Sequence, residues 1–294
     1  MTKNSDIIIR TASFKDQEKI LTLLNEIFSE QQRAHYVRDF NYYNWKFLST
    51  PFGNPILTVA EANKRIVGVA NLWPWEFNAR GQVFKAMQPC DSVVHPSARG
   101  KGLFRKMRVH NINLVQDRVI SFFFNFPNNQ SLPAYRSIGW NYLGKIKWWV
   151  KILRPINLAR GFVQKQKSEN IRLPDRLKVD ATLLDKLAEE TITFDHYLKI
   201  HRVEGFHSYR YLEHPSRSYG MVFCDNGSKS SAAVFTINQK GVNRELVVVD
   251  LIGSNKHVGE LISLIVKEAK TLNVDLIAVM ANTPFFQNTL WLKG

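Results

Sequence analysis

The sequence predicts an α/β protein in which a mixed sheet is flanked by helices, and it predicts two lobes built on this plan. Strand-like and helix-like patterns alternate through the first half of the chain, which is typical of layered α/β folds. A basic, glycine-containing turn joins a strand to a helix within residues 91–107. The second half then repeats the element order of residues 55–125.

The chain opens with a strand at residues 7–10 and a helix that extends to about residue 28. Ser13 is of the residue type that caps helix N-termini, and it stands just before the apolar repeat. The apolar positions of this helix are Ile20, Leu23, Leu24 and Ile27. Their spacing places them on one face, so we expect that face to be buried against the sheet.

Three strands are expected next, at residues 57–61, 65–75 and 84–94. Asn63 and Lys64 have the chemistry of a tight hairpin turn, and residues 78–81 form a second turn. A helix to about residue 116, a buried strand at 119–126, a short helix and a strand at 142–150 complete the first lobe, residues 1–152. Residues 153–178, basic and weakly periodic, are interpreted as a connector.

The second lobe, residues 179–294, echoes the first. Residues 45–51 and 209–215 share an aromatic, basic, aromatic, leucine and proline pattern. Strands at 221–224, 232–237 and 246–251, a helix at 258–271 and a strand at 276–280 that ends at Asn282 follow the earlier order. This lobe lacks the glycine and arginine turn, and it stops near the counterpart of Gly139, so we interpret it as degenerate and abbreviated or truncated.

Composition limits the class of protein. The 294 residues are 45% hydrophobic and 22% charged, values of an ordinary globular chain, whereas the net charge of +15 is unusual. Cofactor phosphates, an acidic acceptor, nucleic acid, an anionic membrane surface and plain solvated surface are all open as its reason, and charge alone does not choose between them. Cys90 and Cys224 lie far apart without metal-ligand spacing, so we expect no structural zinc and no other metal. No signal peptide or membrane span is expected, which favours a cytoplasmic protein.

The turn after residue 94 predicts a site for a phosphate-bearing cofactor. Gly100 and Gly102 allow close backbone approach, and the helix that follows presents unpaired N–H groups. A Walker loop is excluded because Lys101 is followed by glycine rather than by Ser or Thr. A dinucleotide fingerprint fits poorly because Arg105 stands where a small residue is required.

The spacing Arg99-x-x-Gly102 resembles the cofactor loop of the GNAT superfamily of acyl-CoA-dependent N-acetyltransferases. Phe104 departs from that loop, which usually has Gly or Ala at this place, so it either crowds the pyrophosphate or points into the core. The opening strand and helix, and the Asn-rich segment and Tyr-x-x-x-Gly signature within residues 125–140, are similar to the same superfamily. The resemblance implies a mostly antiparallel sheet and acetyl-CoA or another acyl-CoA as co-substrate.

The resemblance also implies roles for individual residues. The cofactor would be held by Val93, Val94, Arg99, Gly100, Lys101, Gly102, Leu103, Asn125 and Asn128. Arg105, Lys106 and Arg108 could meet its 3′-phosphate, or they form an ordinary charged helix face. Tyr135 stands where such enzymes place the acid that protonates the departing thiolate, although a core tyrosine is the competing interpretation.

No general base stands out. Asp91 and His95 share strand parity with Val93, so these side chains are expected to face one side, and His95 has a suitable intrinsic pKa. Glu61, Glu76 and a water-mediated route remain open. Cys90 lacks a nucleophile's partners and is expected to be an inert thiol. Two tryptophan pairs, 73 with 75 and 148 with 149, form either an acceptor floor or the contact between lobes.

The expected function is therefore transfer of an acetyl or other acyl group from acyl-CoA to a primary amine of a small molecule or peptide. Two alternatives stay open. One is a two-lobed transferase that takes an aminoacyl group from tRNA, which suits the charge; the other is a non-catalytic basic module that binds nucleic acid or a scaffold. A homodimer is also left open.

Overall fold

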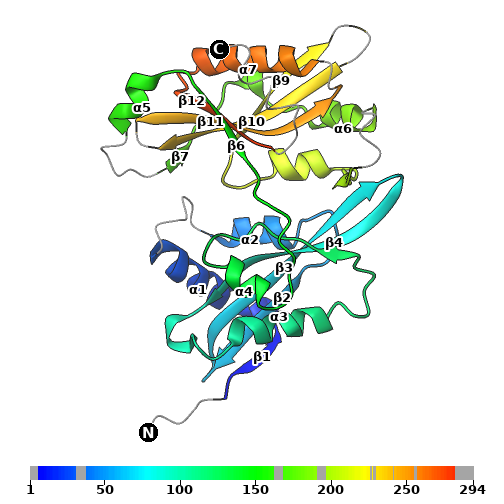
Figure 1. Cartoon of the computed structure of the whole chain (residues 1–294), viewed down its shortest axis with the longest axis vertical. Coiled ribbons are helices and arrows are strands. Elements are labelled where there is room, and N and C mark those ends of the chain that lie inside the picture. Colours follow the sequence, from blue (N-terminus) through cyan, green and yellow to red (C-terminus); the bar gives the residue numbers. More distant parts are fainter. Residues whose placement is uncertain are drawn as a thin grey trace. The chain divides into compact units, whose positions relative to one another are not determined.

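The computed structural model describes residues 6–30, 38–161, 168–190, 197–225, 227, 230–240, 242–254 and 257–281. It divides into two units. Unit 1 comprises Met1–Leu143 and Asp195–His201, and unit 2 comprises Gly144–Phe194 and Arg202–Gly294. Each unit has its own sheet, with six strands among the described residues, and helices packed on it (Figure 1).

The sheet of unit 1 has the order β1-β2-β3-β4-β5. Its strands are β1 (Ile8–Thr11), β2 (Ile56–Ala62), β3 (Arg65–Ala79), β4 (Gln82–Val94) and β5 (Phe122–Phe123), and β8 (Lys199–Ile200) pairs with β3. The pairs from β1 to β4 are antiparallel, and β4 with β5 is parallel. The expected mixed, mostly antiparallel sheet is confirmed.

Both predicted hairpin turns are present. Asn63 and Lys64 have φ values of 50° and 63° between β2 and β3, and Arg80 and Gly81 have φ values of 50° and 74° between β3 and β4. Two consecutive residues with positive φ are what a tight hairpin with the right-handed twist of its strands requires. Asparagine and glycine tolerate this region more easily than other residues, which is why the sequence signalled these turns.

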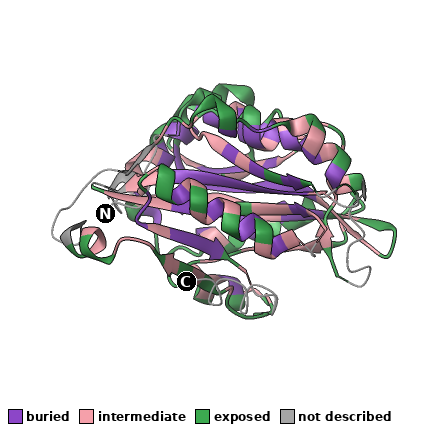
Figure 2. Ribbon diagram, turned by 90° about the horizontal axis from the view of Figure 1, so that it is seen from above, coloured by how far each residue is buried: buried purple, intermediate pink, exposed green. Residues whose placement is uncertain are grey.

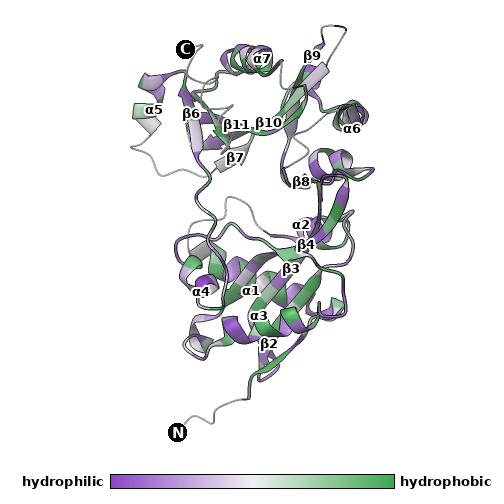
Figure 3. Ribbon diagram, turned by 45° about the vertical axis from the view of Figure 1, so that its right-hand side comes forward, coloured by the Kyte–Doolittle hydropathy of each residue, from purple (hydrophilic) through white to green (hydrophobic). Residues whose placement is uncertain are grey.

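The helical elements of unit 1 are η1 (Phe14–Asp16), α1 (Gln17–Glu30), α2 (Phe40–Phe47), η2 (Pro96–Ala98), α3 (Leu103–Asn113) and α4 (Leu132–Arg136). Ser13 precedes η1, and its N–H and hydroxyl both donate to Asp16 Oδ2, so the chain is capped where predicted. The apolar stripe of α1 is buried, with each of its four predicted members at most 3% exposed. Figures 2 and 3 show the corresponding division of the helices into buried and exposed, and into hydrophobic and hydrophilic, parts.

Helix α3 packs on β2 and β3 through Leu103 and Met107. The approach is close at Gly68, where a Cβ atom would lie 3.0 Å from Met107 Cε. Val94 joins this cluster. Because neighbouring residues on a strand point to opposite faces, Val93 and His95 point to the other face, where α1 lies.

Unit 2 repeats the arrangement. Its strands are β6 (Trp148–Ile152), β7 (Ser168–Asn170), β9 (Tyr219–Asp225), β10 (Ser230–Lys240), β11 (Asn243–Gly253) and β12 (Leu276–Met280). Its helical elements are α5 (Pro155–Gly161), η3 (Asp175–Leu177), α6 (Ala181–Glu190), the π-helical η4 (Ser208–Leu212) and α7 (Val258–Thr271). The succession β9, β10, β11, α7 and β12 matches β2, β3, β4, α3 and β5, and β11 with β12 is parallel as β4 with β5 is.

Several expectations differ from the structure. The last strand of the first lobe is expected at 142–150, whereas the structure has β6 at Trp148–Ile152, and this strand pairs with the edge of β12 in the sheet of unit 2. The connector at 153–178 contains α5 and β7. The strand at 119–126 is reduced to Phe122–Phe123, and its flank is exposed, with Val119 at 85%. Asn282, where the last strand is expected to end, lies outside the described residues, as does the end of the second lobe.

Candidate active site

The site forms where β4 and β5 separate. They pair only at Ala86 with Phe122 and at Met87 with Phe123. Beyond these pairs, β4 continues to Val94 with β3 as its only strand partner among the described residues. Along this stretch the edge of β4 that faces away from β3 has no strand partner among the described residues, so it is open to a ligand with amide groups.

The backbone after β4 turns sharply through Gly100 (φ 76°) and Gly102 (φ 67°) into α3. The N–H groups of residues 100 to 105 donate to no protein acceptor within the described chain, whereas the next N–H, of Lys106, donates to the Gly102 carbonyl. A Cβ atom at either glycine would meet nothing within 4 Å. The loop thus combines free donors, open space and the positive end of a helix dipole, which together suit an anion.

Basic side chains surround this loop unevenly. Lys101, Arg105 and Lys106 are exposed, and Arg99 folds back so that its Nε donates to the Val94 carbonyl at 3.2 Å. The burial of Arg108 differs from what we expected for a residue of the exposed, charged face of the helix. This residue is 2% exposed, because its position on α3 faces the sheet rather than solvent.

The buried guanidinium of Arg108 donates to the Asn71 carbonyl at 3.4 Å and to Ser92 Oγ. Its Nε has no hydrogen-bond partner among the described residues. Burial lowers the pKa of Arg108, although the nearby Tyr135 opposes that shift. The guanidinium carbon lies 5.8 Å from the centroid of the Tyr135 ring, so a fixed positive charge stands beside the predicted acid.

Tyr135 on α4 is 4% exposed. Its ring packs edge-on against Phe104 at 5.2 Å and Trp140 at 4.9 Å. Burial raises the pKa of Tyr135, while Arg108 and a hydrogen bond to Asn125 act in the opposite direction. The phenol therefore stays protonated near neutral pH and can donate. Phe104 does not crowd the loop glycines, since it lies against Tyr135 instead.

The two asparagines have different surroundings. Asn128 Oδ1 accepts from the N–H groups of Gln130 at 3.0 Å and Ser131 at 2.9 Å, which caps the start of the α4 segment. Asn125 Oδ1 accepts from the Phe126 N–H at 2.8 Å, and its side chain also reaches the Tyr135 hydroxyl. Asn125 thus lies beside the candidate acid, whereas Asn128 has a structural partner set.

His95 lies at the end of β4 and is half-buried. Its Nδ1 accepts from the Ser97 N–H at 3.2 Å, and its Nε2 is 3.2 Å from Glu26 Oε1 on α1. When Nδ1 is the acceptor, the neutral ring carries its proton on Nε2 and donates it to Glu26. Both ring nitrogens are then engaged, so action as a base requires one of these contacts to open.

Asp91 lies on the same face as His95, as strand parity indicates, but deeper. It adopts φ 41° at an irregularity in the pairing of β4 with β3. Its carboxylate contacts Lys46 Nζ at 2.7 Å and Arg38 Nε at 3.2 Å. Lys46 and Arg38 overcome the effect of burial and hold the pKa of Asp91 below its usual value, so this carboxylate is a weak base.

Cys90 is adjacent to this charged cluster. Burial raises the pKa of its thiol to about 12, against the opposing effect of Lys46. A nucleophilic cysteine requires the thiolate. The geometry therefore agrees with the expectation of an inert thiol.

The tryptophans divide between the units. Trp73 and Trp75 pack at 4.7 Å from each other, Trp73 contacts Trp45, and Trp75 contacts Phe124. The indole N–H groups of Trp73 and Trp75 have no acceptor within the described chain. Trp149 belongs to unit 2, where its indole N–H donates to the Ala281 carbonyl.

A family model for the acetyltransferase (GNAT) domain matches residues 8–143. This range contains β1, the loop at residues 99–103 and Tyr135. Unit 1 is a GNAT acetyltransferase domain. The assignment makes the chain an enzyme of the acyltransferase class, and it confirms the resemblance inferred from residues 8–11, 99–102 and 125–140. No curated protein sequence matches the chain.

Solved structures show that the likeness extends beyond the GNAT domain. A GCN5-related N-acetyltransferase from Anabaena variabilis superposes with a TM-score of 0.65 at 13% identity, over 97% of this chain and 68% of that one. A GCN5-related N-acetyltransferase from Kribbella flavida gives 0.56 at 11%, over 95% and 65%. The N-myristoyltransferase of Saccharomyces cerevisiae, solved with myristoyl-CoA, gives 0.56 at 12%, over 99% and 80%. At these identities the likeness concerns the fold.

The described part of the chain has no helix with the length and apolarity that a membrane span needs.

Proposed function

We propose that unit 1 transfers an acetyl or other acyl group from acyl-CoA to a primary amine of a small molecule or peptide. The single observation that supports this most is the loop at residues 99–103. The N–H groups of residues 100–103 donate to no acceptor within the described chain, the two glycines have open space around them, and basic side chains flank the loop. Diphosphate is the part of acyl-CoA that such a loop would bind.

The open edge of β4 extends the site from this loop toward the reaction centre. Val93 and Val94 lie on that strand. In this proposal, backbone groups of this stretch would bond the amides of a pantetheine arm, and Arg99 would have to release the Val94 carbonyl if that group takes part. Asn125 is on the facing segment after β5, near Tyr135. The bound thioester would supply an activated acyl carbonyl, and the amine would attack its carbon while the C–S bond breaks.

In this proposal Tyr135 would give its proton to the departing sulfur, and Arg108 would stabilise the negative charge that develops there. Arg108 lies 5.8 Å over the Tyr135 ring, is fully buried and has a free Nε. A fixed charge in a dry site acts more strongly than one in water. The sequence alone grouped Arg108 with Arg105 and Lys106, as a ligand of the 3′-phosphate or as part of a charged helix face, because only its contacts distinguish it from the exposed Arg105.

The amine must lose a proton during the reaction. His95 would accept it after releasing Glu26 or Ser97, and water is the other route. Asp91 is the less suitable candidate, since its charge is committed to Lys46 and Arg38. Glu76, which pairs with His201 at 3.1 Å, is a further carboxylate of unit 1.

The test is ligand-induced thermal stabilisation, because a ligand that binds only the folded form raises the melting temperature by mass action. We expect acetyl-CoA to raise the melting temperature of the wild type and of Gly53→Glu, but not of Gly102→Glu. Gly53 is a matched control, since it has positive φ (96°) and open surroundings in the loop before β2.

Two results would contradict the proposal. One is an equal shift by acetyl-CoA in Gly102→Glu and the wild type. The other is stabilisation by tRNA and not by any acyl-CoA, which would favour an aminoacyl-tRNA-dependent transferase. A series of acyl-CoA lengths in the same assay distinguishes acetyl from longer acyl donors.

A further inference from the structure

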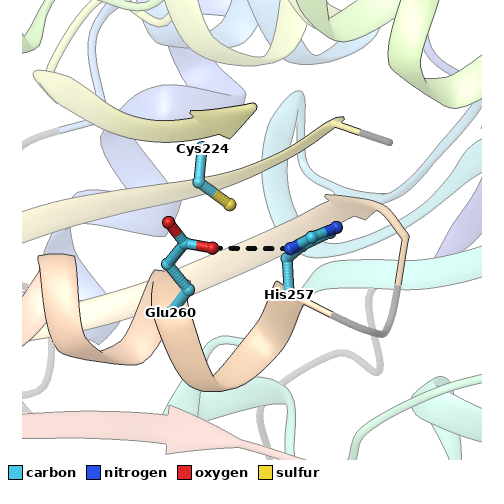
Figure 4. A group of neighbouring side chains, drawn as sticks. All are labelled: Cys224, His257 and Glu260. Carbon is cyan, nitrogen blue, oxygen red and sulfur yellow. Dashed lines mark ion pairs between the residues drawn. The ribbon is translucent and has the colours of Figure 1, made fainter. Parts of the chain in front are cut away.

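We propose that Cys224, His257 and Glu260 of unit 2 form a binding site for a divalent transition-metal ion, and that Zn²⁺ is the ion it fits best. Each of these residues offers one ligand atom, and all three atoms lie within 4.8 Å of one another. Figure 4 shows the Cys224 sulfur pointing into the space between the other two side chains. The site is separate from the acyl-transfer centre and does not depend on its function.

The three ligands come from ordered elements. Cys224 is on β9, where it is paired with Ser231 of β10. His257 stands immediately before α7, and Glu260 is in the first turn of that helix. The spacing of three residues brings His257, at the N-cap of α7, and Glu260 to one side of the start of the helix, and β9 supplies the third ligand from the sheet.

The distances suit a small tetrahedral ion. Zn²⁺ binds sulfur at about 2.3 Å and nitrogen or oxygen at about 2.0–2.2 Å, so its ligand atoms are separated by roughly 3.2–3.8 Å. His257 Nδ1 lies 3.4 Å from Glu260 Oε2, within this range. The sulfur is within 4.8 Å of both, and the exposed Glu260 side chain is free to adjust by rotation.

The donor set identifies the class of ion. A thiolate and an imidazole select zinc and similar ions over calcium or magnesium, which prefer oxygen ligands alone. The thiolate and the carboxylate together neutralise a divalent cation. Because cysteine binds such an ion as the thiolate, binding releases the thiol proton to solvent.

Burial is graded across the site. Cys224 is 6% exposed, the His257 side chain 11% and the Glu260 side chain 57%. The ion can therefore enter from the Glu260 side, and water can occupy the fourth position. An ion pair between His257 and Glu260 alone would not require the Cys224 sulfur beside it. The convergence of a third donor from another element is what points to a metal.

The location has a counterpart in unit 1. The cofactor loop precedes α3, and His257 with Glu260 occupies the same place before α7 in the repeated order of elements. Unit 2 lacks the Arg-x-x-Gly loop. In our proposals the start of α3 binds an anion in unit 1, whereas the start of α7 binds a cation in unit 2. The cation would link β9 to the start of α7.

The experiment uses the full chain, treated with a chelator and titrated with Co²⁺ as a spectroscopic probe for Zn²⁺. We expect one equivalent of Co²⁺ to produce a thiolate-to-cobalt charge-transfer band and the intense visible bands of a tetrahedral site. Zn²⁺ should then displace Co²⁺ and abolish these bands. Zinc content after gel filtration should approach one ion per chain.

Three variants decide the assignment. Cys224→Ser should lose the charge-transfer band, Glu260→Gln should weaken Co²⁺ binding by about tenfold or more, and Cys90→Ser, the matched control, should bind as the wild type does. Because Glu260 is exposed, Glu260→Gln tests the site even where Cys224→Ser fails to fold. No band in the wild type, a band retained in Cys224→Ser, or unchanged affinity in Glu260→Gln would overturn the proposal.

Discussion

Lys46 Nζ lies 2.7 Å from Asp91 Oδ2 in the interior of unit 1, and the two side chains are 7% and 6% exposed. Arg38 contacts the other carboxylate oxygen at 3.2 Å. The ammonium group also lies 5.1 Å from the centroid of the Trp73 ring. A buried charge without a partner has a large desolvation cost, so each member of this cluster depends on the others.

Lys46→Met should therefore lower the free energy of unfolding by about 3–5 kcal/mol, the usual cost of stranding one partner of a buried pair. Urea denaturation with unchanged m-value measures this. Lys85→Met, which removes an exposed lysine on β4, should change stability by less than about 0.5 kcal/mol. Equal effects of the two substitutions would show that burial of the pair has no energetic role.

Acid should destabilise unit 1 in part through Asp16. Arg10 donates to both Asp16 oxygens, at 2.7 and 2.8 Å, and this holds the pKa of Asp16 well below its usual value. A lowered folded-state pKa gives stability that is complete above the unfolded pKa, about 3.9, and is lost as pH falls through the folded value. Asp16→Asn should flatten the fall in unfolding free energy below about pH 4. Parallel pH profiles for variant and wild type would count against the pair.

Tyr135→Phe should slow acyl transfer by about 10²-fold or more, the usual contribution of a general acid, with little change in affinity for CoA. The phenyl ring keeps its contacts with Phe104 and Trp140, so the fold should persist. Steady-state kinetics with a generic amine and calorimetry with CoA separate the two effects. Tyr142→Phe, at an exposed position, is the control. Full turnover in Tyr135→Phe would remove this residue from the chemistry.

Gly68→Ala should destabilise unit 1 by about 1–3 kcal/mol, the cost of overpacking a closed core. The new methyl group would meet Met107 Cε at 3.0 Å and Ala60 Cβ at 3.2 Å. The double variant with Met107→Ala should show coupling, because the second change removes the side chain that the first one strikes. Thermal unfolding of both singles and the double measures this coupling, and strict additivity would contradict the packing argument.

Local chemistry was predictable from the sequence. The positive φ at Asn63 and Gly81, the buried stripe of α1 and the open glycines of the loop before α3 each depend on residues close together in the chain. The repeated order of elements was predictable for the same reason. The family match over residues 8–143 confirms the resemblance that these segments indicated.

Other features were decided only by the tertiary structure, because they depend on contacts between residues far apart in the chain. Arg105 and Arg108 look alike in sequence, yet packing of α3 on the sheet exposes one and buries the other beside Tyr135. The strand β6 pairs with β12, which lies more than a hundred residues later in the chain. Cys224 and His257 have no metal-ligand spacing in the sequence, and only the packing of α7 against β9 brings them together. Side-chain chemistry determines the local conformation, whereas the burial of a residue and its contacts with distant residues follow from long-range packing.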